Sequence, residues 1–149
     1  MDAVLSSDGL YRYRLERTWD SSKPKILFIM LNPSTADASQ DDPTIRRIIR
    51  FARDWGYGGL LVGNLYAFRS TKPVALKTAA DPVGPENIAH IEAMVKMCEK
   101  VVYAYGNNQS EPDWLKSLVA EPYVIKRSKK GIPSHPLYLK ADLVPTKFR

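Results

Sequence analysis

Cysteine is almost absent from this chain, since Cys98 is the only one. A disulfide within the chain is therefore excluded, and so is a zinc site built mainly from thiolates. Cys98 falls on the apolar stripe of a predicted helix, which favours a packing role over a catalytic one. The chain also lacks the G-x-x-x-x-G-K-S/T and G-x-G-x-x-G motifs, which excludes a P-loop and a dinucleotide-binding fingerprint.

Long apolar runs are missing as well. None approaches the length of about 20 residues that a membrane-spanning helix requires. The first residues, MDAVLSSDG, have neither the basic nor the apolar region of a signal peptide. We therefore expect a cytoplasmic protein that makes no membrane association.

The 149 residues are 44% hydrophobic, which is typical of one globular domain, here spanning residues 1–149 and favoured as a monomer. A domain of this size buries roughly two-thirds of its unfolded surface. The 22 Lys and Arg residues outnumber the 16 Asp and Glu residues, which gives a net charge of +6. This balance favours polyanionic partners, a nucleic acid or a nucleotide among them.

Apolar runs alternate with helical patterns along the chain. An alternating segment at 10–19 predicts an edge strand with one wet face, and four short apolar runs predict buried strands at 25–31, 60–65, 101–105 and 123–125. Helices are expected from Pro43 to about 55 and from about 85 to 98, and a short third helix is expected after Ser110, which has capping-box spacing with Asp113, with its apolar face within 114–119. Because crossover connections are right-handed, this order predicts a three-layer α/β/α fold with a central, mostly parallel four-stranded sheet plus an N-terminal edge strand.

The chain is organised around residues 25–45. The apolar run ends abruptly at Asn32-Pro33-Ser34, and Asp42 then precedes Pro43 as an N-cap precedes the first residue of a helix. This pattern predicts a strand, a polar loop and a helix. Ligands of open α/β sheets collect at the carboxyl ends of strands, so this turn is the first place to look for chemistry.

Polar and aromatic residues follow each predicted parallel strand, and the fold should gather them at one edge. They are Asn32, Ser34 and Asp37, then Asn64, Tyr66, Phe68 and Arg69, then Asn107 and Asn108, and finally His135. Amide side chains combine a donor with an acceptor, as the edge of a nucleobase requires, and aromatic rings stack on its face. A single asparagine often only caps a loop, but amides at several strand ends favour a base-sized pocket. The proline-rich connection 70–84 is long enough for a lid or a binding loop.

Four cations lie close to His135 in the sequence: Lys126, Arg127, Lys129 and Lys130. They are the candidates for phosphate contacts. Two other interpretations stay open. The chain is either a non-catalytic nucleotide- or nucleic-acid-binding module, or a hydrolase or transferase for a small metabolite that uses Asp37, Asp41 and Asp42 with a cation. We expect no resident metal and no cofactor.

Three segments, LFIMLNPSTAD, NLYAFRSTKP and DPVGPEN, closely resemble the family known as domain of unknown function 1643. This resemblance covers about residues 10–140. It implies a family without implying an activity.

A more distant resemblance connects four strand ends to the uracil-DNA glycosylase superfamily. Residues 30–34, MLNPS, are similar to its water-activating G-I-N-P-G motif, and residues 63–70, GNLYAFRS, are similar to its T-N-x-V-x-x-R-P motif. Residues 105–107 resemble the glycine that ends its third strand, and residues 134–137, SHPL, resemble its H-P-S-P-like loop. The chain departs from these motifs at Met30, Ser34 and Leu137, which changes the shape of the implied pocket.

This second resemblance implies hydrolysis of an N-glycosidic bond, with a modified base in DNA as the expected substrate. The implied catalytic residues are Asn32, which positions a water, His135, which hydrogen-bonds the leaving base, and Asp37 as an accessory. The implied base-binding residues are Pro33, Ser34, Asn64, Tyr66, Phe68, Arg69 and Asn107. We expect a uracil-DNA-glycosylase-like fold on the same ground.

Overall fold

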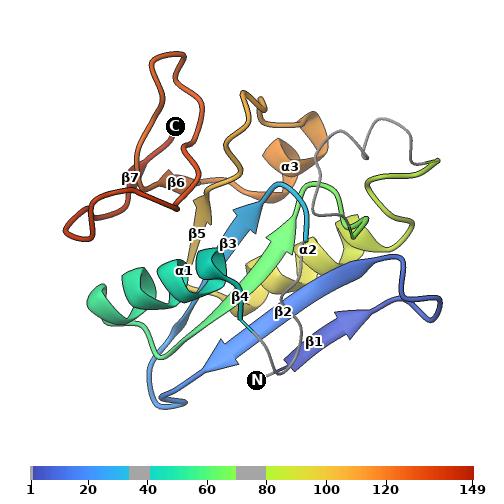
Figure 1. The fold of residues 1–149 in the computed structure, drawn as a ribbon, viewed down its shortest axis with the longest axis horizontal. Coiled ribbons are helices and arrows are strands. Elements are labelled where there is room, and N and C mark those ends of the chain that lie inside the picture. Colours follow the sequence, from blue (N-terminus) through green and yellow to red (C-terminus); the bar gives the residue numbers. More distant parts are fainter. Residues whose placement is uncertain (1, 34–40, 70–79) are drawn as a thin grey trace.

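The computed structural model describes residues 2–33, 41–69 and 80–149. Their strands form one seven-stranded sheet in the order β1-β2-β4-β3-β5-β6-β7, with three helices packed on it (Figure 1). The strands are β1 (Asp2–Leu5), β2 (Arg12–Thr18), β3 (Lys25–Met30), β4 (Gly59–Asn64), β5 (Lys100–Tyr103), β6 (Tyr123–Val124) and β7 (Thr146–Lys147). The helices are α1 (Pro43–Asp54), α2 (Asn87–Met97) and α3 (Asp113–Leu118).

The sheet is mixed, with a parallel centre. Strand β3 runs parallel to β4 and β5, and β5 runs parallel to β6. Strands β2, β1 and β7 join this centre in antiparallel pairings with β4, β2 and β6. The expectation of four strands plus one edge strand is therefore wrong, because short strands extend both sides of the sheet.

The segment predicted as an edge strand lies inside the sheet. Strand β1 pairs with the outer side of β2. A turn joins the two strands, and in it the Gly9 N–H donates to the Ser6 carbonyl at 3.0 Å. Gly9 has a φ of 75°, a left-handed conformation that glycine adopts at little cost. The alternating pattern predicts a wet face with Arg12, Arg14 and Glu16 on it, but Arg12 is only 3% exposed, and Arg17 further along the strand is only 2% exposed. Arg17 is buried with a partner, because its Nε lies 2.7 Å from a carboxylate oxygen of Asp41.

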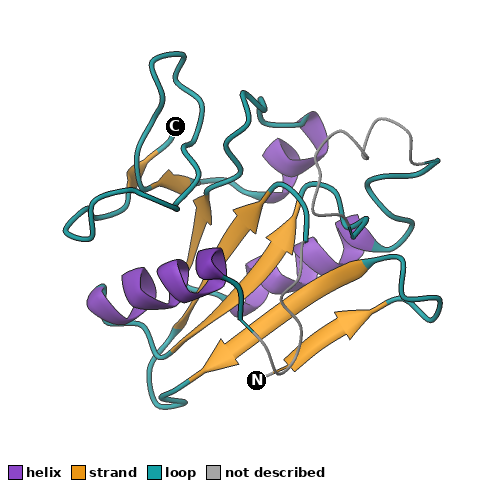
Figure 2. Cartoon of the chain, in the orientation of Figure 1, coloured by secondary structure: helices purple, strands orange, loops and turns teal. Residues whose placement is uncertain are grey.

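Helices cover both faces of the sheet (Figure 2). The apolar stripe of α1 packs on one face through Ile45, Ile48 and Phe51, whereas α2 and α3 pack on the other through Ile91 and Leu115. This arrangement of helices confirms the predicted α/β character. Within the described ranges, no helix has the length and the apolar character needed to cross a membrane.

Helix α1 begins and ends as its sequence predicts. The Asp42 side chain accepts a hydrogen bond from the Ile45 N–H at 2.8 Å, and Pro43 follows this N-cap directly. Gly56, with a φ of 88°, ends the helix. The capping box expected for α3 is wrong, because Pro112 precedes this helix and no side chain caps it.

Candidate functional site

The polar strand ends meet at one edge, where the arrowheads of β3, β4 and β5 point (Figure 2). Met30 pairs with Asn64 in register, and the Leu65 N–H donates to the Met30 carbonyl at 2.9 Å. On the other side of β3, the Ala104 N–H donates to the Ile29 carbonyl at 2.9 Å. Neighbouring strands lie about 4.8 Å apart, so the ends of β4 and β5 are separated by about 10 Å with β3 between them.

Asn64 ends β4 as a buried amide, 2% exposed. A Cβ atom on the preceding Gly63 would lie 2.9 Å from the Met94 side chain of α2. Since successive side chains of a strand point to opposite faces, Asn64 points to the α1 face. Its Nδ2 is buried and makes no hydrogen bond with any described residue. An unsatisfied buried amide costs about 1–3 kcal/mol, and a ligand atom is one way to satisfy it.

His135 lies at the end of β5. The Gly106 N–H donates to the Pro133 carbonyl at 3.1 Å, and a Cβ atom on Gly106 would lie 3.0 Å from the Cβ of His135. The Nδ1 atom of His135 accepts from the Leu137 N–H at 3.2 Å. In the neutral imidazole, Nε2 therefore carries the proton and is the donor.

The charge of His135 is set mainly by its partly buried position. Burial lowers its pKa, and the nearby Asp42 carboxylate opposes this effect in part. Because Asp42 caps α1, this interaction also places His135 near the first turn of that helix. A neutral His135 at neutral pH is the form that donates through Nε2 without carrying a charge.

This lowered pKa predicts a pH dependence of stability. As the pH falls, the unfolded chain binds a proton at His135 before the folded chain does. The contribution of this residue to the free energy of unfolding should therefore be complete above the ordinary histidine pKa, about 6.5, and should decrease as the pH drops below it. The His135→Gln variant should show a shallower loss between pH 7 and pH 5. Urea unfolding of both proteins across this range measures the difference, and identical slopes would show that His135 titrates alike in both states.

Asn32, Asp41 and Asp42 are described by the structure, and each has a hydrogen-bond or ion-pair partner. Asn32 is half-buried and its Nδ2 donates to the Pro33 carbonyl at 3.2 Å, whereas Pro33 itself is buried. Asp41 binds Arg17 and Asp42 caps α1, so both carboxylates have structural partners. The predicted site residues Ser34 and Asp37 lie outside the described residues, as does the segment 70–79 of the expected binding loop. Among the residues that are described, no group of three or more His, Cys, Asp or Glu could hold a metal ion.

The residues that follow β4 diverge. The Tyr66 hydroxyl donates to the Gln109 side chain at 3.1 Å, which joins the end of β4 to the turn after β5. Phe68 instead packs edge-on against Tyr11, with ring centroids 6.1 Å apart, and the Arg69 N–H donates to the Leu10 carbonyl at 2.9 Å. The structure therefore places Tyr66 near the other strand ends and places Phe68 and Arg69 beside the residues that lead into β2.

The turn after β5 has an unusual backbone. Gly106, Asn107 and Asn108 have φ values of 58°, 55° and 54°, three left-handed residues in succession. Such a conformation is uncommon for residues other than glycine and is concentrated at functional sites. The Asn107 side chain supports the turn by donating to the Tyr105 carbonyl at 3.1 Å.

The four predicted phosphate contacts lie on a hairpin, residues 126–134, closed by a hydrogen bond of 2.9 Å from the Ser134 N–H to the Lys126 carbonyl. This hairpin projects beyond the sheet and leads directly into His135 (Figure 1). Lys126, Lys129 and Lys130 are exposed and make no ion pair with a described residue. Arg127 has another role, because its guanidinium lies 4.6 Å from the Phe148 ring centroid and donates to the Phe148 carbonyl.

One buried polar residue escaped the sequence reasoning. Asn87 begins α2, is fully buried, and donates through Nδ2 to the Asn64 carbonyl at 2.8 Å. It fixes the end of β4 from the α2 face, and its Oδ1 has no partner among the described residues. Its signal in the sequence is the segment DPVGPEN, which carries the family resemblance.

Residues 12–137 match the model of a protein family described as "Protein of unknown function (DUF1643)". No curated protein and no solved structure matches the chain significantly.

Proposed function

The chain belongs to the DUF1643 family, and we propose that it binds a nucleobase at the carboxyl edge of its sheet and hydrolyses the N-glycosidic bond of that base in a nucleic acid. The observation that carries this proposal is a pair of donors at two strand ends, those of β4 and β5, on either side of β3. Asn64 offers a buried Nδ2 without a partner among the described residues, and His135 offers its Nε2–H. Two directed donors across a gap of about 10 Å suit a flat heterocycle that bears acceptor atoms.

Recognition divides between the ends of β4 and β3. The Asn64 amide donates to an acceptor on the base edge, and its burial makes that hydrogen bond discriminating, because a ligand without the acceptor leaves the amide unsatisfied. Tyr66, oriented by Gln109, supplies an aromatic face at the same edge. Asn32 follows β3, the strand beside β4, and its amide orients the attacking water.

The chemistry follows from a neutral imidazole donor. The bond between the sugar C1′ and the base nitrogen breaks, and its electron pair leaves with the base. His135 Nε2–H stabilises the developing negative charge on the base by a hydrogen bond. The water oxygen bonds to C1′, and the water proton ends on the released base. Asp37 is the accessory group that accepts this proton in transit.

The proposed substrate is a nucleic acid strand and not a free nucleoside. Lys126, Lys129 and Lys130 lie exposed on the hairpin that leads into His135 and form no ion pair with a described residue, and phosphates are suitable partners for them. A base reaches the edge of the sheet only after it leaves its stack, so the lysines would hold the backbone on either side of the extruded nucleotide.

The similarity of four strand-end motifs to the uracil-DNA glycosylase superfamily supports the proposed reaction and a fold related to that superfamily. Met30, Ser34 and Leu137 stand where those motifs have other residues. Each of these residues is larger than the motif residue that it replaces, so the proposed base is a modified or mismatched one and uracil is one member of the panel to be tested.

Base release tests this proposal. Purified protein is incubated with duplexes that carry uracil, mismatches or hypermodified bases, and alkali-labile breaks are counted. His135→Ala and Asn32→Ala should each lower the rate by about 100-fold or more on the substrate that is cleaved. Lys96→Gln, a change of charge on the exposed side of α2, is the control and should keep the wild-type rate. Cleavage that survives both site substitutions would refute the assigned roles.

A second candidate function is a binding module that lacks turnover. The observation in its favour is that Asp41 and Asp42, the described carboxylates of the β3–α1 connection, are engaged by Arg17 and by the α1 N-terminus. Saturable binding of the same duplexes without product after prolonged incubation would favour this function. Affinity for the duplexes that disappears at physiological salt would instead favour a hydrolase or transferase for a small metabolite.

A further inference from the structure

Helix α1 carries an excess of positive charge. Four arginines and one aspartate lie in its 12 residues, which gives the helix a net charge of +3. The charged residues of α2, on the other face of the sheet, balance instead, since Glu92 pairs with Lys96 at 3.8 Å. Of the two longer helices, α1 is therefore the one that attracts a polyanion.

Three arginines of α1 share its solvent side, and we call them the arginine stripe. They are Arg46, Arg50 and Arg53, all exposed. At about 100° and 1.5 Å per residue, they fall within an arc of about 60° opposite the buried Ile48 and extend for about 10 Å along the helix axis. Arg47 lies outside the stripe, because its guanidinium donates to the Leu139 carbonyl.

The charge of the stripe stays exposed to solvent. Among the described residues, its one ion pair joins Arg50 to Asp54 at 3.9 Å, with side chains that are 70% and 52% exposed. A pair so exposed is screened by salt and contributes little. The Arg53 guanidinium lies 4.7 Å from the Trp19 ring centroid, a contact that orients it without neutralising it.

The stripe begins beside the proposed base site. Arg46 donates through Nη1 to the Asp41 carbonyl at 2.9 Å, and Asp42, the next residue, caps α1 and lies near His135. Because α1 connects the carboxyl end of β3 to the amino end of β4, the stripe leads away from the site across the face of the sheet (Figure 1). A polyanion that leaves the site in this direction meets three guanidinium groups in succession.

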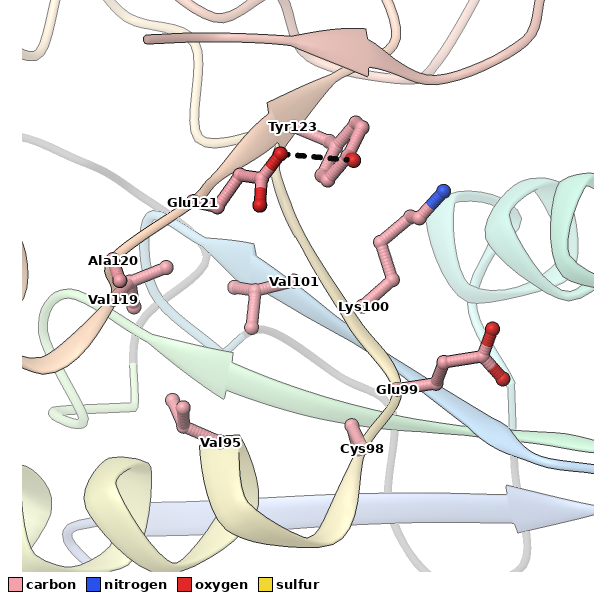
Figure 3. Close-up of a pocket in the computed structure, with 9 residues that line it drawn as sticks. All are labelled: Val95, Cys98, Glu99, Lys100, Val101, Val119, Ala120, Glu121 and Tyr123. Carbon is pink, nitrogen blue, oxygen red and sulfur yellow. Dashed lines mark hydrogen bonds between the residues drawn. The ribbon is translucent and has the colours of Figure 1, made fainter.

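Charges of both signs mix at the amino end of β5. Figure 3 shows Glu99 and Lys100 next to each other there, with Glu121 on the segment that leads into β6. Glu121 pairs with Lys147 at 2.8 Å, and the Lys100 Nζ lies 4.2 Å from the Tyr123 ring centroid. This end of the sheet presents a mixed surface, which a polyanion does not favour.

We propose that the arginine stripe binds backbone phosphates of the nucleic acid that flanks the extruded base. Phosphates of one strand follow each other about every 3.4 Å along a duplex axis, so a stripe of about 10 Å spans about three of them. Guanidinium groups match phosphate oxygens in charge and in geometry. A nucleic acid suits this surface better than a membrane does, because the apolar residues of α1 that would enter a lipid layer are buried in the core. The direction of the bound strand rests on the proposed function, whereas phosphate binding by the stripe does not.

The salt dependence of duplex binding tests this inference. The anisotropy of a labelled, unmodified duplex of about 20 base pairs is followed between about 50 and about 300 mM NaCl with the full chain and with an Arg50→Gln/Arg53→Gln variant, which keeps Arg46 beside the site. Each phosphate contact adds about 0.9 to the slope of log K against log salt, so the slope should be smaller by about two in the variant, and affinity at about 100 mM should be at least about tenfold lower. Lys96→Gln/Lys116→Gln makes the same change of charge at exposed positions of α2 and α3 and should keep the wild-type slope.

Each other outcome has a defined meaning. An unchanged slope in the folded arginine variant, an equal loss of slope in the lysine control, or no duplex binding by the wild-type chain at about 50 mM NaCl would overturn the proposal. Vesicles of phosphatidylcholine and phosphatidylserine are a further probe, and tighter binding to them that depends on the same two arginines would overturn it in favour of a membrane. Because the duplex is unmodified, a smaller slope in the variant together with no base release from any modified duplex would refute the proposed hydrolysis and uphold the stripe.

Discussion

Replacement of Gly58 by alanine should destabilise the protein by more than about 3 kcal/mol. A Cβ atom at this position would lie 1.9 Å from the Asp20 carbonyl oxygen and 2.7 Å from the Lys23 Cβ. The backbone there has no freedom to retreat, because the Gly58 N–H donates to the Pro24 carbonyl at 2.9 Å and its own carbonyl accepts from the N–H groups of Trp19 and Asp20. Relief of the clash requires breaking the hydrogen bonds that join Gly58 to the connection between β2 and β3.

Gly56→Ala is the matched control, two residues away. Gly56 has a φ of 88°, but a Cβ atom there would meet nothing within 4 Å. Its substitution should therefore cost only the left-handed backbone conformation, about 1–2 kcal/mol. Urea unfolding at one pH measures both variants. Equal losses at the two positions would mean that the turn at residues 20–24 adapts to a side chain.

Substitution at Gly106 should have the second largest effect, and it should reach the site. Gly106 combines a φ of 58° with a close approach to His135, whose backbone nitrogen would lie 3.2 Å from an added Cβ. Alanine there should cost about 2–3 kcal/mol, from the left-handed conformation and from the contact together. It should also displace His135 and lower base release by at least about tenfold, because donor placement controls transition-state stabilisation.

Gly9→Ala separates these two causes. Gly9 has a φ of 75° and open space where a Cβ would stand, far along the chain from the strand ends that form the site. Its loss of stability should match the backbone part of the Gly106→Ala effect, and base release should keep its wild-type rate. If both variants lower base release alike, loss of stability rather than displacement of His135 would explain the result.

The parallel centre of the fold was accessible from the sequence because its signals are local. The run from Ile26 to Leu31 is apolar throughout, as expected of a strand buried on both faces, and polar residues follow it. Asp42, Pro43 and Gly56 marked the limits of α1 through capping chemistry that acts within a few residues. For β3 and for the two ends of α1, the prediction from the sequence and the structure therefore agree.

The sheet edges were not accessible in this way. Strands β1 and β7 have four and two residues, and their pairing depends on partners that are distant in the chain. Alternation of charge in β2 indicated an exposed edge, yet Arg17 is buried because Asp41 arrives from another loop to pair with it. Tertiary partners of this kind leave no local pattern.

The candidate site shows the same division. That Asn64 and His135 belong to one edge of the sheet is predicted by the sequence, because both follow strands expected to be parallel, whereas the place of β3 between the ends of β4 and β5 is seen only in the structure. That Phe68 and Arg69 turn toward the residues before β2, and that Arg127 stacks on Phe148, depends on contacts across the fold. The role of Asn87, which ties α2 to the end of β4, depends on such a contact as well.

The central claim is that a base binds at the carboxyl edge against Asn64. The most direct test follows the side-chain amide resonances of Asn64 in the full chain while a short duplex with a U·G mismatch, and then one with each modified base, is added. The account predicts a large, saturable shift of the Asn64 amide with at least one of these duplexes, together with a shift of the His135 imidazole. Duplex binding that shifts the lysines of the 126–134 hairpin but leaves the Asn64 amide unchanged would contradict it.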